Sequence, residues 1–389
     1  MLRLRERIVS HLLSSSSTSA PAISPLHRLL SAAAAAAPVS PNPGSFAVEE
    51  YLVDTCGLTR PQALKASKKL SHLKSPAKPD AVLAFLSGLG LSGADAAAVV
   101  AKDPLFLCAK VDKTLAPVVA GLTGLGLSRP DIARFVSLAG SRFRYTSVVS
   151  KMHYYLPLFG SLDSILRALR RSSYLLSSDL DKVINPNVVF LRECGLADCD
   201  IAKLCVCEPR LLGYKPERVR AMVACAERLG VRRGSGMFRV ALQAVAFLSE
   251  EKIAAKVDHL KKAFSWSDAE VVAALSMAPM LLKRSKDTLW CRFEFLVSEV
   301  GLEPGYIAHR PVMLYYSLEG RLKPRYYALK FLKENGLLNH DWNFYTAVTR
   351  SEKYFMKKCI CPHKEAAPHL AEDYAAACRG EMPSNFRFT

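Results

Sequence analysis

The chain has 389 residues, of which 50% are hydrophobic and 23% are charged. This composition excludes a disordered or collagen-like protein and supplies enough apolar surface for a large core, so a globular or solenoidal fold is expected. The 53 Lys and Arg residues against 35 Asp and Glu residues leave a net charge of +18, which favours a polyanionic partner, either nucleic acid or an anionic membrane surface.

The first 45 residues differ in composition from the rest of the chain. They contain four arginines, ten serines and a single acidic residue, Glu6. This composition is typical of an organellar transit peptide, with a disordered N-terminus as the alternative. A secretory signal peptide would need one apolar stretch of about 7–15 residues, and the serine run at 14–17 interrupts the candidate. Arg3, Arg5 and Arg7 lie among aliphatic residues and favour a mitochondrial over a chloroplast address. We predict a transit peptide at residues 1–45.

Glycine followed by an aliphatic residue recurs through the remaining chain with a spacing near 35 residues. The glycines are Gly57, Gly90, Gly126, Gly195, Gly230, Gly301 and Gly336. The two double-length gaps become regular if further positions fall at Gly160 and Ser265. A fixed period of 20–50 residues predicts a repeat architecture.

Each period carries the signals of two helices and a short third element. An apolar pattern of helical spacing precedes the glycine, which supplies a left-handed C-cap. An N-cap signature such as Thr59-x-x-Gln62 starts the second helix. That helix ends near a proline, as at Pro209, and an apolar pair such as Leu211-Leu212 and a basic turn follow.

Strands are not expected, because no segment alternates with period two for long. A helix pair with a short third element cannot bury its apolar face alone, so the units must stack. We predict an all-α, right-curving α-solenoid of repeats of about 35 residues at 46–355, followed by a C-terminal tail at 356–389.

Several helical-repeat classes have similar periods. The tetratricopeptide signature is absent, HEAT and armadillo units are longer, and pentatricopeptide units lack the proline after the second helix. A Gly-Leu-Ser turn, Asp-Ile in the second helix, and a proline followed by Leu-Leu resemble the mitochondrial transcription termination factor (mTERF) family, in its plant-type organellar form. The clearest matching segments are 195–212 and 310–325. Departures are Gly140 and Tyr174 in place of proline, and an insertion at 232–236.

The resemblance implies an all-α superhelix, organellar targeting, and binding of double-stranded DNA or RNA along a basic surface without catalysis. The basic excess fits this expectation, since residues 46–200 carry a net charge of +5, residues 201–340 carry +9 and residues 341–389 carry +1. Bases recur after the proline and at the start of the next helix, so stacking would align them as a stripe that follows a phosphate backbone.

The predicted nucleic-acid-binding residues are Arg142, Arg144, Arg210, Lys215, Arg218, Lys283, Arg284, Arg292, Arg310, Arg321, Lys323 and Arg325. Any one of them taken alone is better explained by a solvated helix face or by an interaction with a helix C-terminus, and the recurrence is what favours the set. Tyrosines lie among these bases and are interpreted first as packed side chains and second as stacking partners for unpaired bases. They are Tyr214, Tyr315, Tyr316, Tyr326 and Tyr327.

The sequence lacks the motifs of common NTPase, zinc-protease and hydrolase chemistry. The phosphate-binding loop, the zinc-protease motif and the nucleophile elbow are all absent, so neither an enzyme nor a cofactor is predicted. Cys359-x-Cys361-x-His363 has poor spacing for zinc, and no metal is expected.

The eleven cysteines are irregularly spread, which favours a reducing compartment. No apolar run reaches the roughly 18 residues of a membrane span, so no integral membrane association is expected.

The predicted function is that of a monomeric organellar protein that regulates transcription or transcription termination by occupying double-stranded DNA. The predicted location is the mitochondrion, with the chloroplast as alternative. The alternative function is an RNA-binding or protein-interaction scaffold in organellar splicing or ribosome assembly, with ribonucleoprotein partners.

Overall fold

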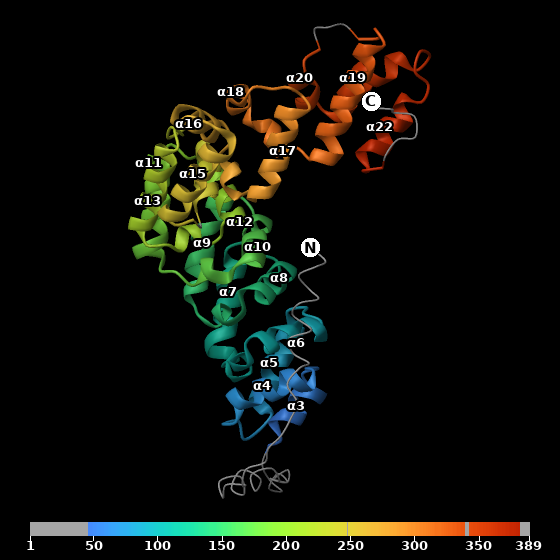
Figure 1. The fold of residues 1–389 in the computed structure, drawn as a ribbon. Coiled ribbons are helices and arrows are strands. Elements are labelled where there is room, and N and C mark those ends of the chain that lie inside the picture. The colour runs from blue at the N-terminus through green and yellow to red at the C-terminus, as the bar shows by residue number, and fades with distance from the viewer. Residues whose placement is uncertain (1–45, 247, 339–341, 382–389) are drawn as a thin grey trace, which may run out of the picture.

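The computed structural model describes residues 46–246, 248–338 and 342–381, and the predicted transit peptide lies outside them. The described residues form helices joined by short turns, without strands. Figure 1 shows the helices following one another along a curved path from α3 to α22. The predicted all-α solenoid of helical repeats is confirmed.

Each unit contains a first helix and a second helix. The first helices are α3 (Val48–Asp54), α5 (Ala77–Gly88), α7 (Ala116–Gly124), α9 (Ser147–Phe159), α11 (Asn185–Glu193), α13 (Pro216–Arg228), α15 (Glu250–Phe264), α17 (Lys286–Ser298) and α19 (Lys323–Glu334). The second helices are α4 (Arg60–Leu70), α6 (Gly93–Lys102), α8 (Arg129–Ala139), α10 (Leu162–Arg171), α12 (Asp198–Cys207), α14 (Phe238–Val245), α16 (Asp268–Met277), α18 (Pro304–Ala308) and α20 (Phe344–Thr349).

Six units end in a short 3₁₀ helix, which is the predicted third element. These are η1 (Pro104–Cys108), η3 (Gly140–Arg144), η4 (Ser173–Leu176), η6 (Leu211–Gly213), η7 (Pro279–Lys283) and η8 (Pro311–Tyr315). Single π-helical turns lead into three first helices: η2 (Val111–Leu115) into α7, η5 (Leu180–Ile184) into α11 and η9 (Leu318–Leu322) into α19. After α20 come α21 (Glu352–Phe355), η10 (Met356–Ile360), η11 (Cys361–His363) and α22 (Leu370–Cys378).

The predicted caps are present where the second helices begin. Thr59 and Gln62 form a capping box at α4, and Ser267 and Glu270 form another at α16. The Ser128 hydroxyl accepts the Asp131 N–H at the start of α8. These contacts satisfy N–H groups that have no partner inside the helix, and the second helices α4, α8 and α16 each start three residues after the turn position.

The turn between the two helices of a unit has a left-handed backbone throughout the repeat. All nine positions of the predicted ladder have a positive φ, from 53° at Ser265 to 91° at Gly90. The two inserted positions, Gly160 and Ser265, are included, so the period of about 35 residues is confirmed without a break.

Ser265 is the one non-glycine residue with a positive φ in the described part of the chain. A side chain in this conformation costs roughly 1 kcal/mol, because Cβ approaches the carbonyl oxygen. We expect Ser265→Gly to raise the free energy of unfolding by about 0.5–1 kcal/mol in urea denaturation. The reciprocal change Gly160→Ser should lower it, since no atom lies within 4 Å of a Cβ at Gly160 and only the backbone opposes the substitution. A less stable Ser265→Gly variant would contradict this account.

One continuous hydrophobic core runs along the solenoid, from Leu52 to Val348. The third elements contribute to it and contact each other from unit to unit. The Phe106 ring of η1 lies 6.3 Å from the Phe143 ring of η3. At Gly213 of η6 an added Cβ would lie 2.5 Å from the Tyr174 ring of η4, so only glycine permits this approach. The third elements therefore form one edge of the solenoid.

The unit formed by α13 and α14, which we call the Gly230 unit after its turn glycine, departs from the pattern. Its second helix, α14, leads into α15 without a third element. Its insertion at 232–236 lies on the preceding unit, since a Cβ at Gly195 would meet the Gly234 Cα at 2.9 Å. Glu208, at the end of α12, reaches beyond this unit to Lys283 of η7, with Oε1 and Nζ 2.6 Å apart. This ion pair connects the third-element edge across the unit that lacks the element.

The C-terminal segment beyond residue 355, predicted as a tail, is folded as far as Glu381. Phe355, Ile360, Leu370 and Tyr374 form a second hydrophobic core with Leu332 of α19. The apolar residues of this segment recur at helical spacing and find a partner face on α19, which is why it packs. No helix in the described ranges is long and apolar enough to cross a bilayer.

Candidate nucleic-acid interface

The third-element edge gathers the predicted binding residues of the later units. The ion pair of Glu208 with Lys283 joins the end of α12 to η7, and the Arg284 guanidinium lies 5.8 Å from the centre of the Tyr315 ring in η8. The edge continues to α20, because Arg310 lies 5.2 Å from the Tyr345 ring. Bases that are far apart in the sequence thus follow one another along a single edge.

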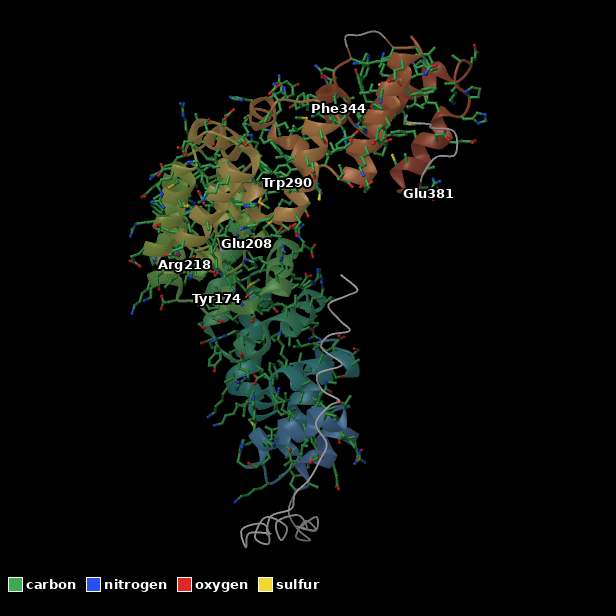
Figure 2. All side chains as sticks on the ribbon, in the orientation of Figure 1. Tyr174, Glu208, Arg218, Trp290, Phe344 and Glu381 are labelled. Atoms are coloured by element: carbon green, nitrogen blue, oxygen red, sulfur yellow. The ribbon has the colours of Figure 1, made fainter. Side chains whose placement is uncertain are left out.

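Five of the predicted residues are exposed on this edge and form no ion pair within the described residues. We call them the basic edge: Arg142, Arg210, Lys215, Arg218 and Arg284. Arg218 stacks on Tyr214, with the guanidinium 3.9 Å from the ring centre, which fixes its orientation while leaving its N–H groups on the surface. Figure 2 shows Tyr174, Glu208 and Arg218 in the same part of the arc. Unpaired, solvent-facing cations of this kind are the groups that bind phosphates.

Three further predicted residues are paired with carboxylates. The closest nitrogen–oxygen distances are 3.0 Å from Arg144 to Asp103, 2.6 Å from Lys283 to Glu208 and 2.7 Å from Lys323 to Glu319. A phosphate would have to compete with these carboxylates, so these three residues are weaker candidates than the basic edge.

Arg292, Arg310 and Arg321 are half-buried and already engaged. Arg292 donates to the Leu314 carbonyl at 2.7 Å, and its pKa is lowered by burial and by Arg284. Arg310 stacks on Tyr306 at 4.3 Å, and Arg321 donates to the Val348 carbonyl at 2.9 Å.

The structure corrects the prediction at Arg325. Its side chain is 0% exposed, so it cannot reach a phosphate. The guanidinium donates to the carbonyls of Ala347 at 2.6 Å and Arg350 at 2.7 Å, and to the Glu352 carboxylate at 2.6 Å. The charge of Arg325 therefore stabilises the C-terminal units from inside.

Two further buried polar residues have a similar geometry, and neither is among the predicted binding residues. Lys151 of α9 donates to the Leu176 carbonyl at 2.7 Å, and Asn187 of α11 donates to the Leu212 carbonyl at 2.9 Å. The signal was present in the sequence, because both lie on the apolar stripe of a first helix, where a polar side chain requires a partner.

The tyrosines among the bases are mainly packed, as the first interpretation held. Tyr315 is half-buried, and burial raises the pKa of its hydroxyl to about 12. Tyr326 donates to the Glu299 carbonyl and packs on Phe295. Two aromatic side chains that the analysis did not select are exposed on the edge, Tyr145 at 52% and Tyr174 at 42%.

The cysteine cluster does not assemble into a metal centre. Cys359 is buried whereas Cys361 is exposed, and burial raises the pKa of the Cys359 thiol to about 12. No group of three or more metal-ligating side chains is found in the part of the chain that the structure describes. On the basic edge, the side chains that a ligand can contact are cations and aromatic rings.

Comparison with known proteins agrees with the repeat geometry. The family model described as mTERF matches residues 83–235 and 142–356. Transcription termination factor MTERF8, chloroplastic, from Arabidopsis thaliana is 24% identical over 277 residues, which are 70% of this chain and 54% of that protein. Transcription termination factor MTEF18, mitochondrial, from the same plant is 25% identical over 108 residues, or 28% of this chain and 19% of that protein. The chain spans about half the length of the first relative and about a fifth of the second.

Proposed function

This chain belongs to the mTERF family, and on that basis we propose that it is an organellar protein that occupies double-stranded DNA through its basic edge. Binding at such a site would regulate transcription or its termination by obstructing or recruiting the transcription machinery. The relatives named as transcription termination factors support this role. The role requires no catalytic step.

The observation that carries the proposal is the alignment of the basic edge. Its five cations come from four different units and are free of carboxylate partners in the described ranges. A row of exposed cations can contact successive phosphates along a duplex, and it binds by releasing condensed counterions. The test is the affinity of the full chain for a labelled duplex between about 50 and 200 mM salt, where affinity should fall steeply.

The location is proposed from the N-terminal composition. Arginines among aliphatic residues at 1–45 favour the mitochondrion, with the chloroplast as the alternative, and one relative is named for each organelle. Import assays with isolated mitochondria and chloroplasts distinguish the two locations. The organelle that protects the imported chain from added protease is the one to which the chain is targeted.

A second candidate ligand is single-stranded RNA. The observation in its favour is the exposure of Tyr145 and Tyr174 beside the cations, since an exposed ring can stack on an unpaired base whereas a base pair hides its faces. Competition between duplex DNA, duplex RNA and single-stranded RNA for the full chain ranks the ligands. Preference for the single strand would place the protein in RNA processing or ribosome assembly.

Two neighbouring residues offer a matched test of the interface. Arg284→Ala should weaken duplex binding and reduce the salt slope by about one, because one phosphate contact is lost, with little change in stability. Lys283→Ala should instead cost roughly 2 kcal/mol of stability, because it leaves the Glu208 carboxylate buried without its ion pair. Fluorescence anisotropy and urea denaturation of both variants make the comparison. If both substitutions weakened duplex binding equally, the assignment of Arg284 to the interface and of Lys283 to the ion pair would be wrong.

A further inference from the structure

In four units the first helix holds the end of its own unit through a polar side chain that is buried or, for Arg292, half-buried. Lys151 donates to Leu176 O, Arg292 donates to Leu314 O, and Arg325 donates to Ala347 O and Arg350 O. Asn187 uses its amide nitrogen for both Leu212 O at 2.9 Å and Tyr214 O at 2.7 Å. We call these four side chains the closing donors.

The acceptors are the carbonyls where a unit passes into the turn that follows it. These carbonyls lie at or just beyond the last residues of a short helix, where no further backbone N–H is available inside the element. Without a donor from the first helix these carbonyls would be unpaired, except that of Arg350, which also accepts from Arg321, and the turn would not have a fixed distance from the rest of its unit. Each closing donor therefore sets the position of the turn that follows.

Asn187 is the closing donor beside the largest group of exposed cations. The carbonyls that it holds flank Gly213, Arg210 lies two residues before the first, and Lys215 follows the second directly. Tyr214, whose carbonyl is held, also carries the stacked Arg218. Three members of the basic edge are thus attached to backbone that a single side chain holds in place.

Asn187 itself is fully buried, and its Oδ1 atom has no hydrogen-bond partner among the described residues. A buried amide with an unpaired oxygen costs free energy compared with an apolar residue of the same size. The two hydrogen bonds that its amide donates to the turn offset this cost. The need to hold the turn therefore explains why an asparagine occupies this position, where packing in the core alone would favour an apolar residue.

We infer that Asn187 is a positioning residue for nucleic-acid binding, holding Arg210, Lys215 and Arg218 at the spacing of the phosphates. The inference rests on the proposed function. Cations on a fixed turn lose less conformational freedom on binding than cations on a loose one, so the same charges bind more tightly.

The test compares Asn187→Asp with Asn185→Asp in the full chain. Both variants add one negative charge to α11, but Asn185 is exposed and only accepts from the Tyr154 hydroxyl, which a carboxylate also does. The carboxylate introduced by Asn187→Asp has no N–H group and cannot donate to either carbonyl. Asn187→Leu, which is uncharged and of similar size, serves as a second variant in case Asn187→Asp does not fold.

The first readout is independent of nucleic acid. The amides of Gly213 and Tyr214 donate within the turn, to Arg210 O and Leu211 O, so they should be protected from hydrogen exchange. We expect faster exchange at these two amides in the Asn187 variants and not in Asn185→Asp. Unchanged exchange overturns the inference, because the turn would then not depend on Asn187.

The second readout is the affinity for a labelled duplex. We expect Asn187→Asp to bind about tenfold more weakly than Asn185→Asp, and the double change Arg210→Ala with Lys215→Ala to have a smaller effect on top of Asn187→Asp than in the unmodified chain. Equal affinity of the two aspartate variants, or fully additive losses, overturns the inference alone. An unmodified chain that binds no nucleic acid overturns the proposed function and the inference with it, whatever the exchange rates show.

Discussion

Replacing Arg325 by alanine is expected to destabilise the C-terminal units by about 3–5 kcal/mol and to leave the intrinsic affinity for nucleic acid unchanged in the protein that stays folded. The substitution removes a fully buried cation, leaves the Ala347 carbonyl without its side-chain donor, and leaves the Arg350 carbonyl with Arg321 as its remaining donor. Truncating one partner of a buried, hydrogen-bonded charge network has a cost of this size. Arg325→Lys should recover little, because an ammonium cannot supply the planar fork.

The measurement is urea denaturation followed by hydrogen exchange of α20, α21 and α22. A matched control on the same helix is Lys330→Ala, because Lys330 lies nearer the surface and its nitrogen is 3.9 Å from Glu334. This change should alter stability by less than about 0.5 kcal/mol. If the Arg325→Ala variant had normal stability and reduced affinity, Arg325 would belong to the binding surface after all.

Replacing all five residues of the basic edge by alanine is expected to abolish most nucleic-acid binding without unfolding the chain. Each lost phosphate contact should reduce the log–log salt slope by about 0.9, so the slope should fall by about four to five. At about 1 kcal/mol for each contact, affinity should fall by about 10³–10⁴-fold. Stability should change little, because none of the five forms an ion pair in the described chain.

The control for this variant removes the same charge elsewhere. Five bases on second helices serve this purpose: Arg60, Lys65, Lys68, Lys69 and Lys203, which are all exposed. Their replacement by alanine should weaken binding only through the net charge of the whole molecule, an effect that salt screens. If both sets of five reduce affinity equally, the interface is not on the third-element edge.

The sequence was sufficient for the repeat because the repeat depends on local signals. A left-handed turn needs glycine or tolerates a small polar residue, so the period predicted Gly160 and Ser265 as turn positions although only one of them is glycine. The side of a helix on which a basic residue lies is also a local signal, and it would have identified Arg325 as a buried residue. Arg325, Ala328, Leu329 and Leu332 form one buried stripe, as helical spacing requires.

Pairing between distant residues could not be predicted in this way. Lys283 and Arg284 are adjacent and chemically similar, yet only Lys283 has a carboxylate partner, and that partner lies 75 residues away. The position of Glu208 opposite η7 depends on the missing third element of the Gly230 unit. The segment after residue 355 was misjudged for a related reason, because its partner face on α19 belongs to another part of the chain.

The ion pair between Glu208 and Lys283 has a consequence for how the molecule unfolds. In an array whose units touch only their neighbours, melting can begin at either end and advance one unit at a time. Glu208 and Lys283 belong to units on opposite sides of the Gly230 unit, so that unit cannot be released without also breaking a contact between its two neighbours. The centre of the array should therefore melt as one cooperative block and persist longest, while the two ends open and close independently of each other.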